Sequence, residues 1–341
     1  MVTQKNLLIV GSNASHALET YYQKHLIALG LPTSIFNSYD YYTKTVISRI
    51  RHRLGDMSIY KEINKQIIKQ VNEQKPDYIW VFKGMEFTTE TIYQLSKLSI
   101  PLINYNPDHP FIRTYASSGG KHIAQSVPLY NMHYCYSRNL CNTIIQDYKI
   151  NAEWLPFGYH ITQQEYDQVE NSSIVPKICF LGNPDMYRAK AVKKIADAGF
   201  KIDVYGYKWS KYIASHKNIK IHELVFGLNF WNVLRKYAVQ LNVFRPHNID
   251  SHNMRTFEIP AAGGIQLAPY SSEHLHFFKE KEEIFLYQND EQMLQQIEYI
   301  MQLTVVQQQA IRAAARNRSL LSAYSYEHRA TQVYHSLVNI A

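Results

Sequence analysis

Two charged residues begin a short apolar segment late in the chain. Arg255 and Glu258 stand three residues apart, and the segment ends at Gly263-Gly264. Residues at i and i+3 share one face of a helix, and a helix N-terminus beside an arginine favours a bound anion. A carboxylate one turn further in repels phosphate and suits a ribose or sugar hydroxyl. A diphosphate next to a sugar hydroxyl is the chemistry of a nucleotide-sugar.

Each residue of this segment could have a structural role in place of a functional one. Glu258 could simply form a salt bridge to Arg255. Asp250, eight residues before Glu258, could cap its own loop. Asn253 could cap the helix, or it could reach the sugar or the phosphates.

Further candidate donor-binding residues follow predicted strands in the second half of the chain. In an open parallel sheet, ligands collect at the carboxyl ends of the strands. Gly182 would let the backbone approach a ligand closely, or it could make a simple tight turn. Arg188, in the first turn of the next helix, could reach phosphates or face solvent, and Tyr207 could stack on a base. The complete set is Gly182, Asn183, Arg188, Gly206, Tyr207, Arg245 and His247.

The first half of the chain offers candidates for the acceptor side. An enzyme that inverts the configuration of the sugar needs a general base for the acceptor hydroxyl, and Asp108 or His16 could serve. Asp108 is alternatively a turn residue between two prolines, and a retaining enzyme would not need the base in the same way. The expected acceptor-side residues, all near predicted strand ends, are Gly11, Ser12, Glu86 and His109.

Composition limits the class of protein. The 341 residues are 46% hydrophobic and 19% charged, which suits two globular domains. The apolar stretch Leu7–Val10 is too short for a signal peptide and no apolar run is long enough to span a bilayer, so we expect a cytoplasmic protein. Three cysteines without a Cys-x-x-Cys pair, and no convincing histidine or Asp-x-Asp motif, argue against a bound metal.

The net charge of +8 favours anionic partners. These could be a nucleotide-sugar, a lipid phosphate, an anionic membrane or nucleic acid, and charge alone does not choose among them. The densest basic patch holds Arg49, Arg51 and Arg53, with Lys44 nearby. It could dock peripherally on the inner face of an anionic membrane, or it could be a solvated helix face.

The order of predicted elements repeats in the two halves of the chain. Strand-like apolar runs alternate with helical runs in each half, which predicts an α/β fold with two doubly wound sheets. A stretch rich in Gln, Glu and Asp, residues 162–173, separates the halves and is interpreted as a linker. The predicted parts are an N-terminal acceptor-side domain (1–160), the linker (161–175), a C-terminal donor domain (176–325) and a final helix (326–341).

The segment 251–264, SHNMRTFEIPAAGG, resembles the donor-site segment of the CgeB-type (spore maturation protein-like) glycosyltransferases, which are related to the group 1 glycosyltransferases. Ala262 is the one departure within it, since cysteine is common there. The resemblance implies a GT-B architecture: two Rossmann-like domains facing a central cleft, a final helix that crosses back, and catalysis without metal. Retaining group 1 enzymes carry a Glu-x7-Glu pair whose first carboxylate lies near the transferred sugar, so the resemblance implies a catalytic role for Asp250. The shorter side chain of Asp250 leaves the sugar contact, and inversion or retention, open.

We therefore expect a glycosyltransferase that moves a hexose-type sugar from a nucleotide-sugar, expected to be a UDP-sugar, to an acceptor hydroxyl in the cleft. The acceptor could be a glycan, a lipid-linked glycan, a protein or nucleic acid, and no cofactor is expected. Two alternatives remain: a nucleotide-sugar epimerase on the same fold, and a non-catalytic protein that binds sugar or nucleic acid. Nucleic-acid binding would weaken steeply with salt, whereas a donor site would discriminate among bases at fixed salt.

Overall fold

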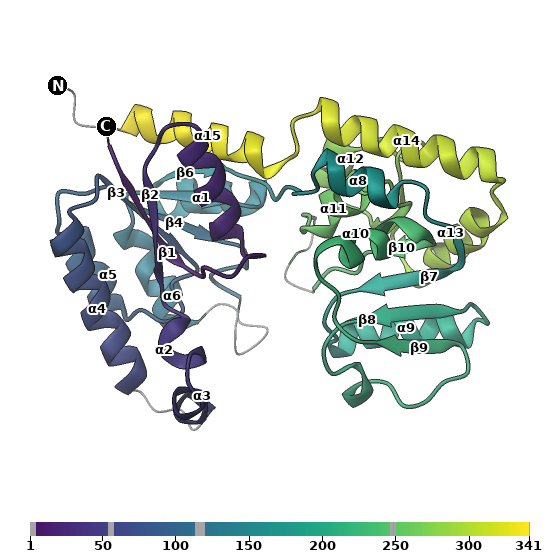
Figure 1. Cartoon of the computed structure of the whole chain (residues 1–341), viewed down its shortest axis with the longest axis horizontal. Helices are drawn as coiled ribbons and strands as arrows, with labels where there is room; N and C mark the ends of the chain where they lie inside the picture. Colours follow the sequence, from purple (N-terminus) through teal and green to yellow (C-terminus); the bar gives the residue numbers. More distant parts are fainter. Residues whose placement is uncertain (1–4, 54–57, 113–119, 246–247, 249, 341) are drawn as a thin grey trace. The chain divides into compact units, whose positions relative to one another are not determined.

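Two β-sheets, each built of parallel strands, form the framework of the protein. The computed structural model describes residues 5–53, 58–112, 120–245, 248 and 250–340. Internal contacts divide the chain into an N-terminal unit, Met1–Pro156 with Tyr326–Ala341, and a C-terminal unit, Phe157–Ser325 (Figure 1). Each unit has its own six-stranded parallel sheet, which confirms the predicted α/β class with two doubly wound sheets.

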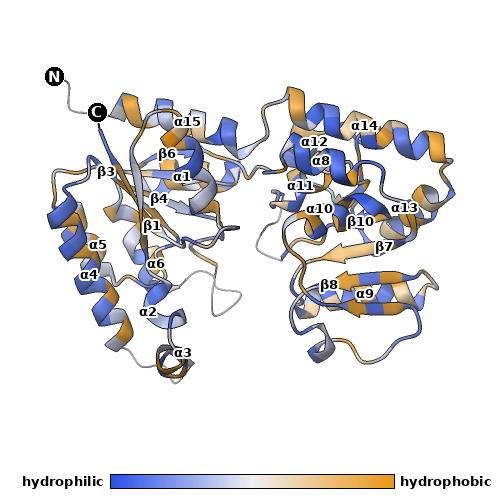
Figure 2. Ribbon diagram, in the orientation of Figure 1, coloured by the Kyte–Doolittle hydropathy of each residue, from blue (hydrophilic) through white to orange (hydrophobic). Residues whose placement is uncertain are grey.

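The strands of the N-terminal unit lie in the order β2-β1-β3-β4-β5-β6. Every residue of β1, β3 and β4 is buried, as expected for parallel strands with both faces covered. Figure 2 shows the hydrophobic residues along β1. The strands are β1 (Leu7–Gly11), β2 (Thr33–Asn37), β3 (Tyr78–Phe82), β4 (Leu102–Asn106), β5 (Met132–Cys135) and β6 (Asn151–Trp154).

Helices cover this sheet, and the last helix of the chain is one of them. Helix α15 packs beside α1, with the Tyr326 ring 5.3 Å from that of Tyr21 (Figure 1). The Tyr78 hydroxyl of β3 donates to the Leu337 carbonyl at 3.0 Å. The helices are α1 (Leu18–Ala28), α2 (Asp40–Thr43), α3 (Val46–Arg53), α4 (Ser58–Gln74), α5 (Thr89–Ser96), α6 (Lys121–Ser126), α7 (Arg138–Tyr148) and α15 (Tyr326–Ile340), with a 3-10 turn η1 (Val127–Leu129).

The sheet of the C-terminal unit has the order β12-β11-β10-β7-β8-β9. The chain runs outward from β7 to β9 and then returns to the other side of β7 as β10. Ligands of open α/β sheets bind at such a reversal, beyond the carboxyl ends of the strands. The strands are β7 (Val175–Leu181), β8 (Ile202–Tyr205), β9 (Ile219–His222), β10 (Tyr237–Leu241), β11 (Gln266–Pro269) and β12 (Ile284–Tyr287).

The stretch that we interpreted as a linker holds a helix of the C-terminal unit. Thr162 and Glu165 form a capping box, in which the threonine hydroxyl accepts the Glu165 N–H at 3.2 Å and the Glu165 carboxylate accepts the Thr162 N–H at 2.8 Å. The helices of this unit are α8 (Gln163–Val169), α9 (Met186–Asp197), α10 (Gly227–Lys236), α11 (Arg255–Ala261), α12 (Ser272–Phe277), α13 (Asp290–Gln302) and α14 (Val305–Leu321), with a 3-10 turn η2 (Trp209–Lys211).

Candidate functional site

Arg188 joins the two loops that meet where the strand order reverses. It lies in the first turn of α9, whose start is capped by Asp185. Its Nε donates to the Val243 carbonyl after β10 at 3.2 Å, and its Nη1 donates to the Asn183 carbonyl after β7 at 3.0 Å. The guanidinium of Arg188 therefore holds these loops together, which is a structural use of a residue predicted to reach phosphates.

The loops after β7 and β8 are also held close to each other. A Cβ added at Gly206 would lie 2.3 Å from the Gly182 carbonyl oxygen, so only glycine fits there. The Asn183 Oδ1 accepts the Tyr207 N–H at 3.0 Å, and the Trp209 indole donates to the Gly182 carbonyl at 3.0 Å. The Tyr207 side chain itself is 56% exposed and can take a stacked base.

Arg255 is fixed at the carboxyl end of β7. Its Nε donates to the Leu181 carbonyl at 3.1 Å, and its guanidinium lies 4.7 Å from the centre of the Phe230 ring. Its Nη1 pairs with the Glu258 Oε2. Among the residues that the structure describes, none forms a hydrogen bond or ion pair with Arg255 Nη2, and the side chain is 22% exposed.

Glu258 lies one turn further along α11 and is buried. Burial raises the pKa of the Glu258 carboxyl above its ordinary value, and the neighbouring charge of Arg255 opposes that rise. One oxygen pairs with Arg255, while Oε1 has no partner in the described part of the chain. The salt bridge that the sequence left open is thus formed, and it places an N–H donor beside a carboxylate acceptor.

Asn253 caps the start of α11. Its Oδ1 accepts the Thr256 N–H at 3.2 Å. Its amide also pairs reciprocally with that of Asn242, the residue after β10, at 2.7 and 3.1 Å. Of the two roles predicted for Asn253, the structure shows the capping one, which orients α11 against the end of β10.

Asp250 points its carboxylate at the next helix. Its Oδ1 accepts the Ser272 N–H at 2.6 Å and its Oδ2 accepts the Ser272 hydroxyl at 3.0 Å, at the start of α12. Its backbone is left-handed, with φ of 52°. Arg245 follows β10 and is half-buried, and its backbone carbonyl accepts the Asn248 N–H at 2.9 Å. His247, the remaining candidate of this loop, lies outside the described residues.

A buried polar cluster beneath the 250–254 turn was not found from the sequence. His252 is fully buried, with its Nδ1 2.5 Å from Glu273 Oε2 and its Nε2 accepting the Phe157 N–H at 3.1 Å. Because Nε2 accepts, Nδ1 carries the proton and donates to the carboxylate. Ser251 donates to the same oxygen at 2.9 Å. The cluster ties the turn to α12, and a His next to a Ser in a predicted loop is a weak signal for it.

In the N-terminal unit, Glu19 organises the loop after β1. Its Oε1 accepts the Ser12 N–H at 2.9 Å, and a Cβ added at Gly11 would lie 2.3 Å from that oxygen. Burial raises the pKa of the Glu19 carboxyl, and the Ser12 N–H and the charge of Lys83 oppose this. Glu19 was missed because carboxylates inside predicted helices are ordinarily solvated.

The ends of β3 and β4 are joined by an ion pair. Lys83 Nζ lies 2.7 Å from Asp108 Oδ2, and Lys83 has a left-handed backbone with φ of 57°. Glu86 is buried beside them and accepts the Tyr42 hydroxyl at 3.0 Å. The structure therefore pairs the predicted Asp108 with Lys83, which was not predicted, and buries the predicted Glu86 in the loop after β3.

The two histidine candidates of this unit differ in setting. His16 is exposed in the turn before α1. His109 is half-buried, and its Nδ1 accepts the Phe111 N–H at 3.3 Å.

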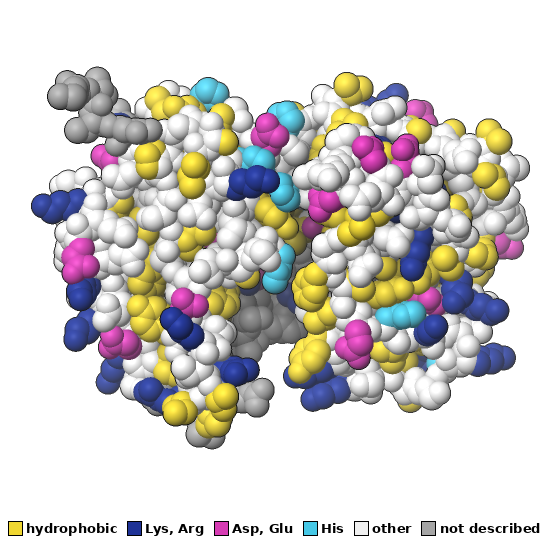
Figure 3. All heavy atoms as spheres, in the orientation of Figure 1, with side chains coloured by type: hydrophobic (Ala, Val, Ile, Leu, Met, Phe, Trp, Pro, Cys, Tyr) yellow, Lys and Arg dark blue, Asp and Glu magenta, His cyan; other side chains and the backbone are white. Residues whose placement is uncertain are grey.

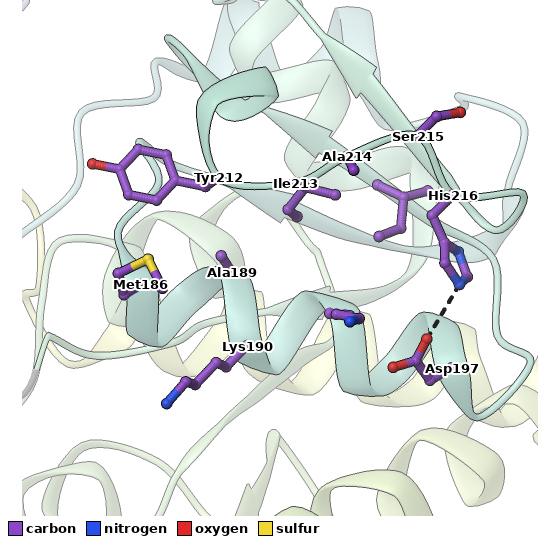
Figure 4. A pocket seen from close by; sticks show the side chains of 11 residues that line it. Met186, Ala189, Lys190, Asp197, Tyr212, Ile213, Ala214, Ser215 and His216 are labelled. Carbon is purple, nitrogen blue, oxygen red and sulfur yellow. Dashed lines mark ion pairs between the residues drawn. The ribbon is translucent and has the colours of Figure 1, made fainter.

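A separate pocket runs along the outer side of α9 (Figure 4). Its volume is about 580 Å³, and it lies between α9 and the segment 212–219. The ion pair of His216 with Asp197, 3.3 Å long, closes one end, and Tyr212 and Met186 stand at the other. Its lining contains none of the predicted site residues, so it is distinct from the strand-end site.

One family model matches this chain, and it covers residues 188–335. The family is described as glycosyl transferase-like. The matched range begins at Arg188 and includes Arg255 and Glu258. No relative was found among proteins of curated function.

Solved structures resemble this chain over nearly its whole length. A glycosyltransferase from Rickettsia africae has a TM-score of 0.66 at 12% identity, covering 99% of this chain and 100% of its own. Sucrose-phosphate synthase from Thermosynechococcus elongatus has a TM-score of 0.70 at 10% identity, covering 99% and 100%. UDP-GlcNAc 2-epimerase from Neisseria meningitidis, bound to UDP-GlcNAc, has a TM-score of 0.58 at 12% identity, covering 98% and 100%.

At these identities the likeness shows the fold, and it confirms the predicted GT-B architecture. The family match describes residues 188–335 as glycosyl transferase-like, the same class as the neighbour from Rickettsia africae.

Proposed function

We propose that this protein is a CgeB-type glycosyltransferase that transfers a hexose-type sugar from a nucleotide-sugar, with UDP as the expected nucleoside diphosphate. The glycosyl transferase-like match supports the reaction class, and it includes Arg255 and Glu258. A neighbour of the same fold was solved with UDP-GlcNAc, which supports a nucleotide-sugar as the donor. The resemblance of segment 251–264 supports the CgeB type.

The single observation that carries this proposal is the arrangement of Arg255 and Glu258. Arg255 Nη2 and Glu258 Oε1 are without partners among the described residues, and they are a donor and an acceptor on one helix face. We assign Arg255 to the donor diphosphate and Glu258 to a ribose hydroxyl. A fixed guanidinium aimed at the leaving diphosphate is worth on the order of 3 kcal/mol in a dry site, and it supplies this charge without a metal ion.

The remaining residues receive supporting roles in the proposal. Tyr207 stacks on the base, while Arg188 and Asn253 hold the loops and α11 in place. On the acceptor side, Asp108 takes the proton of the acceptor hydroxyl if the enzyme inverts configuration, and Lys83 orients its carboxylate.

The test is a thermal-shift panel of UDP, GDP, ADP, CMP and dTDP. A ligand at 100-fold its Kd adds about 2.7 kcal/mol to the free energy of unfolding. We expect one nucleotide to stabilise the wild type and the control Glu298→Ala, which removes an exposed carboxylate of the same unit. Glu258→Ala should lose most of that shift, and Glu258→Gln, which keeps the side-chain shape, guards against loss of folding. No shift with any nucleotide would contradict the proposal.

An epimerase is the second candidate, because the fold neighbour bound to UDP-GlcNAc is a 2-epimerase. Both enzymes would bind the donor at the same strand ends, so nucleotide binding does not separate them. Incubation with UDP-GlcNAc alone, followed by chromatography, separates them by product. A transferase releases UDP in proportion to added acceptor, whereas an epimerase forms an isomer of the intact donor without any acceptor.

A further inference from the structure

Helix α3 carries an apolar face that is exposed in the described part of its unit. Val46 is 63% exposed, Ile47 is 70% exposed and Ile50 is 50% exposed. Positions 46 and 50, and 47 and 50, are neighbours on a helix surface, so these three side chains form one stripe. Isolated exposed apolar residues are ordinary, but three on one short helix indicate an interaction surface.

Cations flank this stripe. At roughly 100° per residue, Arg49 falls on one side of the stripe and Arg51 on the other. Arg49 Nε donates to the Thr45 carbonyl at 3.3 Å, and Arg51 contacts the Ser58 hydroxyl at the start of α4. Arg53 ends the helix, and its side chain lies outside the described residues. In the region of α3, at the lower left of Figure 3, hydrophobic side chains lie next to Lys or Arg side chains.

No acidic residue offsets this charge on the helix, because the segment 44–53, KTVISRIRHR, contains none. The elements packed against α3 are α2 and α4. The carboxylates of these helices that lie nearest to α3 in sequence are Asp40, which accepts the Asn37 amide at 2.7 Å, and Glu62, which accepts the Gln66 amide at 2.7 Å; both keep their negative charge. The segment 44–53 carries four cationic side chains, Lys44, Arg49, Arg51 and Arg53, and Asp56, which follows it, lies outside the described residues. Cations therefore outnumber carboxylates here, and the surface is cationic as well as apolar.

We propose that α3 docks the protein on the surface of an anionic lipid bilayer. Lipid headgroups neutralise Arg49 and Arg51 while Val46, Ile47 and Ile50 enter the boundary with the acyl chains. A second copy of this chain would present the same positive charge, and nucleic acid would leave the three apolar side chains in water. No described helix is long and apolar enough to cross a membrane, so the contact is interfacial. This proposal does not depend on the proposed enzymatic function.

Vesicle co-sedimentation of the full chain tests this. Wild type should bind phosphatidylcholine vesicles that contain phosphatidylglycerol and should not bind phosphatidylcholine alone. Each Lys or Arg near a charged surface contributes about fivefold in partitioning, so Arg49→Ala with Arg51→Ala should weaken binding roughly 25-fold. Ile47→Ser with Ile50→Ser should weaken it at least about tenfold at unchanged charge.

Two control variants make the same kinds of change on other helices of the chain. Lys190→Ala with Lys193→Ala removes the same charge from exposed positions of α9, and Val305→Ser with Val306→Ser removes apolar side chains that are 68% and 74% exposed on α14. Both controls should bind vesicles like the wild type. The proposal fails if wild type binds neither vesicle or both equally. It also fails if the serine variant of α3 binds like the wild type, or if the α9 control loses as much as the arginine variant.

Discussion

At the scale of single residues, Arg255 combines contacts that a lysine could not reproduce. Its Nε donates to the Leu181 carbonyl, its Nη1 pairs with Glu258, and its guanidinium lies over the Phe230 ring. In the proposed site, Nη2 then binds the ligand. A lysine would keep the charge but offer one compact ammonium. The proposed diphosphate contact therefore depends on guanidinium geometry as well as on charge.

Arg255→Lys is expected to weaken UDP binding roughly ten- to hundredfold, since a hydrogen bond to a charged group is worth about 1.5–3 kcal/mol. Affinity for uridine, which has no phosphate, should change much less. Isothermal titration of both ligands against both proteins gives the comparison. An equal loss for UDP and uridine would remove Arg255 from the diphosphate and leave it a structural residue.

Gly206 is the residue at which a single methyl group should disturb the donor loops. The added Cβ would collide with the Gly182 carbonyl at 2.3 Å, which is backbone and cannot rotate away. Gly206→Ala should lower the free energy of unfolding by about 1–3 kcal/mol and weaken nucleotide binding. Gly199→Ala is the control, because φ of 95° strains an alanine there but no atom lies within 4 Å of its Cβ. Chemical denaturation and nucleotide titration of both variants would show whether only Gly206→Ala affects binding.

At the scale of elements, the sequence predicts strand ends better than side-chain partners. The strand before Gly182 and the helix that carries Arg255 could be read from apolar runs and spacing, because these patterns are local. Asp250 shows the limit: its partner Ser272 is 22 residues away, and nothing local distinguishes that contact from a sugar contact. The cluster of His252 with Glu273 was missed for the same reason.

Helix α8 shows a second limit of prediction. Its residues are polar, and only Val169 is buried, so the segment has no apolar periodicity that would reveal a helix. The usable signal was the capping pattern of Thr162 followed three residues later by Glu165. Val169 packs with Trp231 and Leu234, which makes the segment part of a small core that only the folded chain reveals.

Asp250 is expected to stabilise the start of α12. Asp250→Ala removes both contacts to Ser272 and should cost about 1–2 kcal/mol, whereas Asp250→Asn keeps one acceptor and tolerates the left-handed backbone. Hydrogen exchange of residues 271–277 should therefore accelerate in the alanine variant and stay near wild type in the asparagine variant. If Asp250 is also catalytic, Asp250→Asn should lose turnover while α12 keeps its protection. Equal acceleration in both variants would contradict the capping role.

At the scale of the whole molecule, each unit holds a buried histidine that is neutral at pH 7, His133 in the N-terminal unit and His274 in the C-terminal unit. Burial lowers the pKa of His133 to about 4 and that of His274 to about 3. His133 Nε2 donates to the Val127 carbonyl at 2.9 Å, and His274 Nδ1 donates to the Pro269 carbonyl at 3.0 Å. The other nitrogen of His274 lies 3.0 Å from the Thr256 hydroxyl in α11, so neutral His274 helps to hold the helix that carries Arg255 and Glu258.

Acid is expected to destabilise both units because it protonates these two histidines. A histidine of the unfolded chain has a pKa near 6.5, whereas the pKa is about 4 for folded His133 and about 3 for folded His274. Between pH 6.5 and these lower values, the unfolded state therefore binds more protons than the folded state. The free energy of unfolding should therefore fall as pH drops below 6.5, by on the order of 3–5 kcal/mol per histidine at the acid limit. Hydrogen exchange in denaturant from pH 7 to 5, read on peptides of each unit, measures this.

Each histidine serves as the control for the other. His274→Asn keeps a donor for the Pro269 carbonyl, and it should reduce the pH dependence in the C-terminal unit by up to about 1.4 kcal/mol per pH unit. It should leave the pH dependence of the N-terminal unit unchanged, and His133→Asn should do the reverse. Each variant can lose stability at pH 7, but the slope with pH reports the proton and not the packing. Slopes equal to those of the wild type in both variants would show that other groups bind the protons that destabilise the fold in acid.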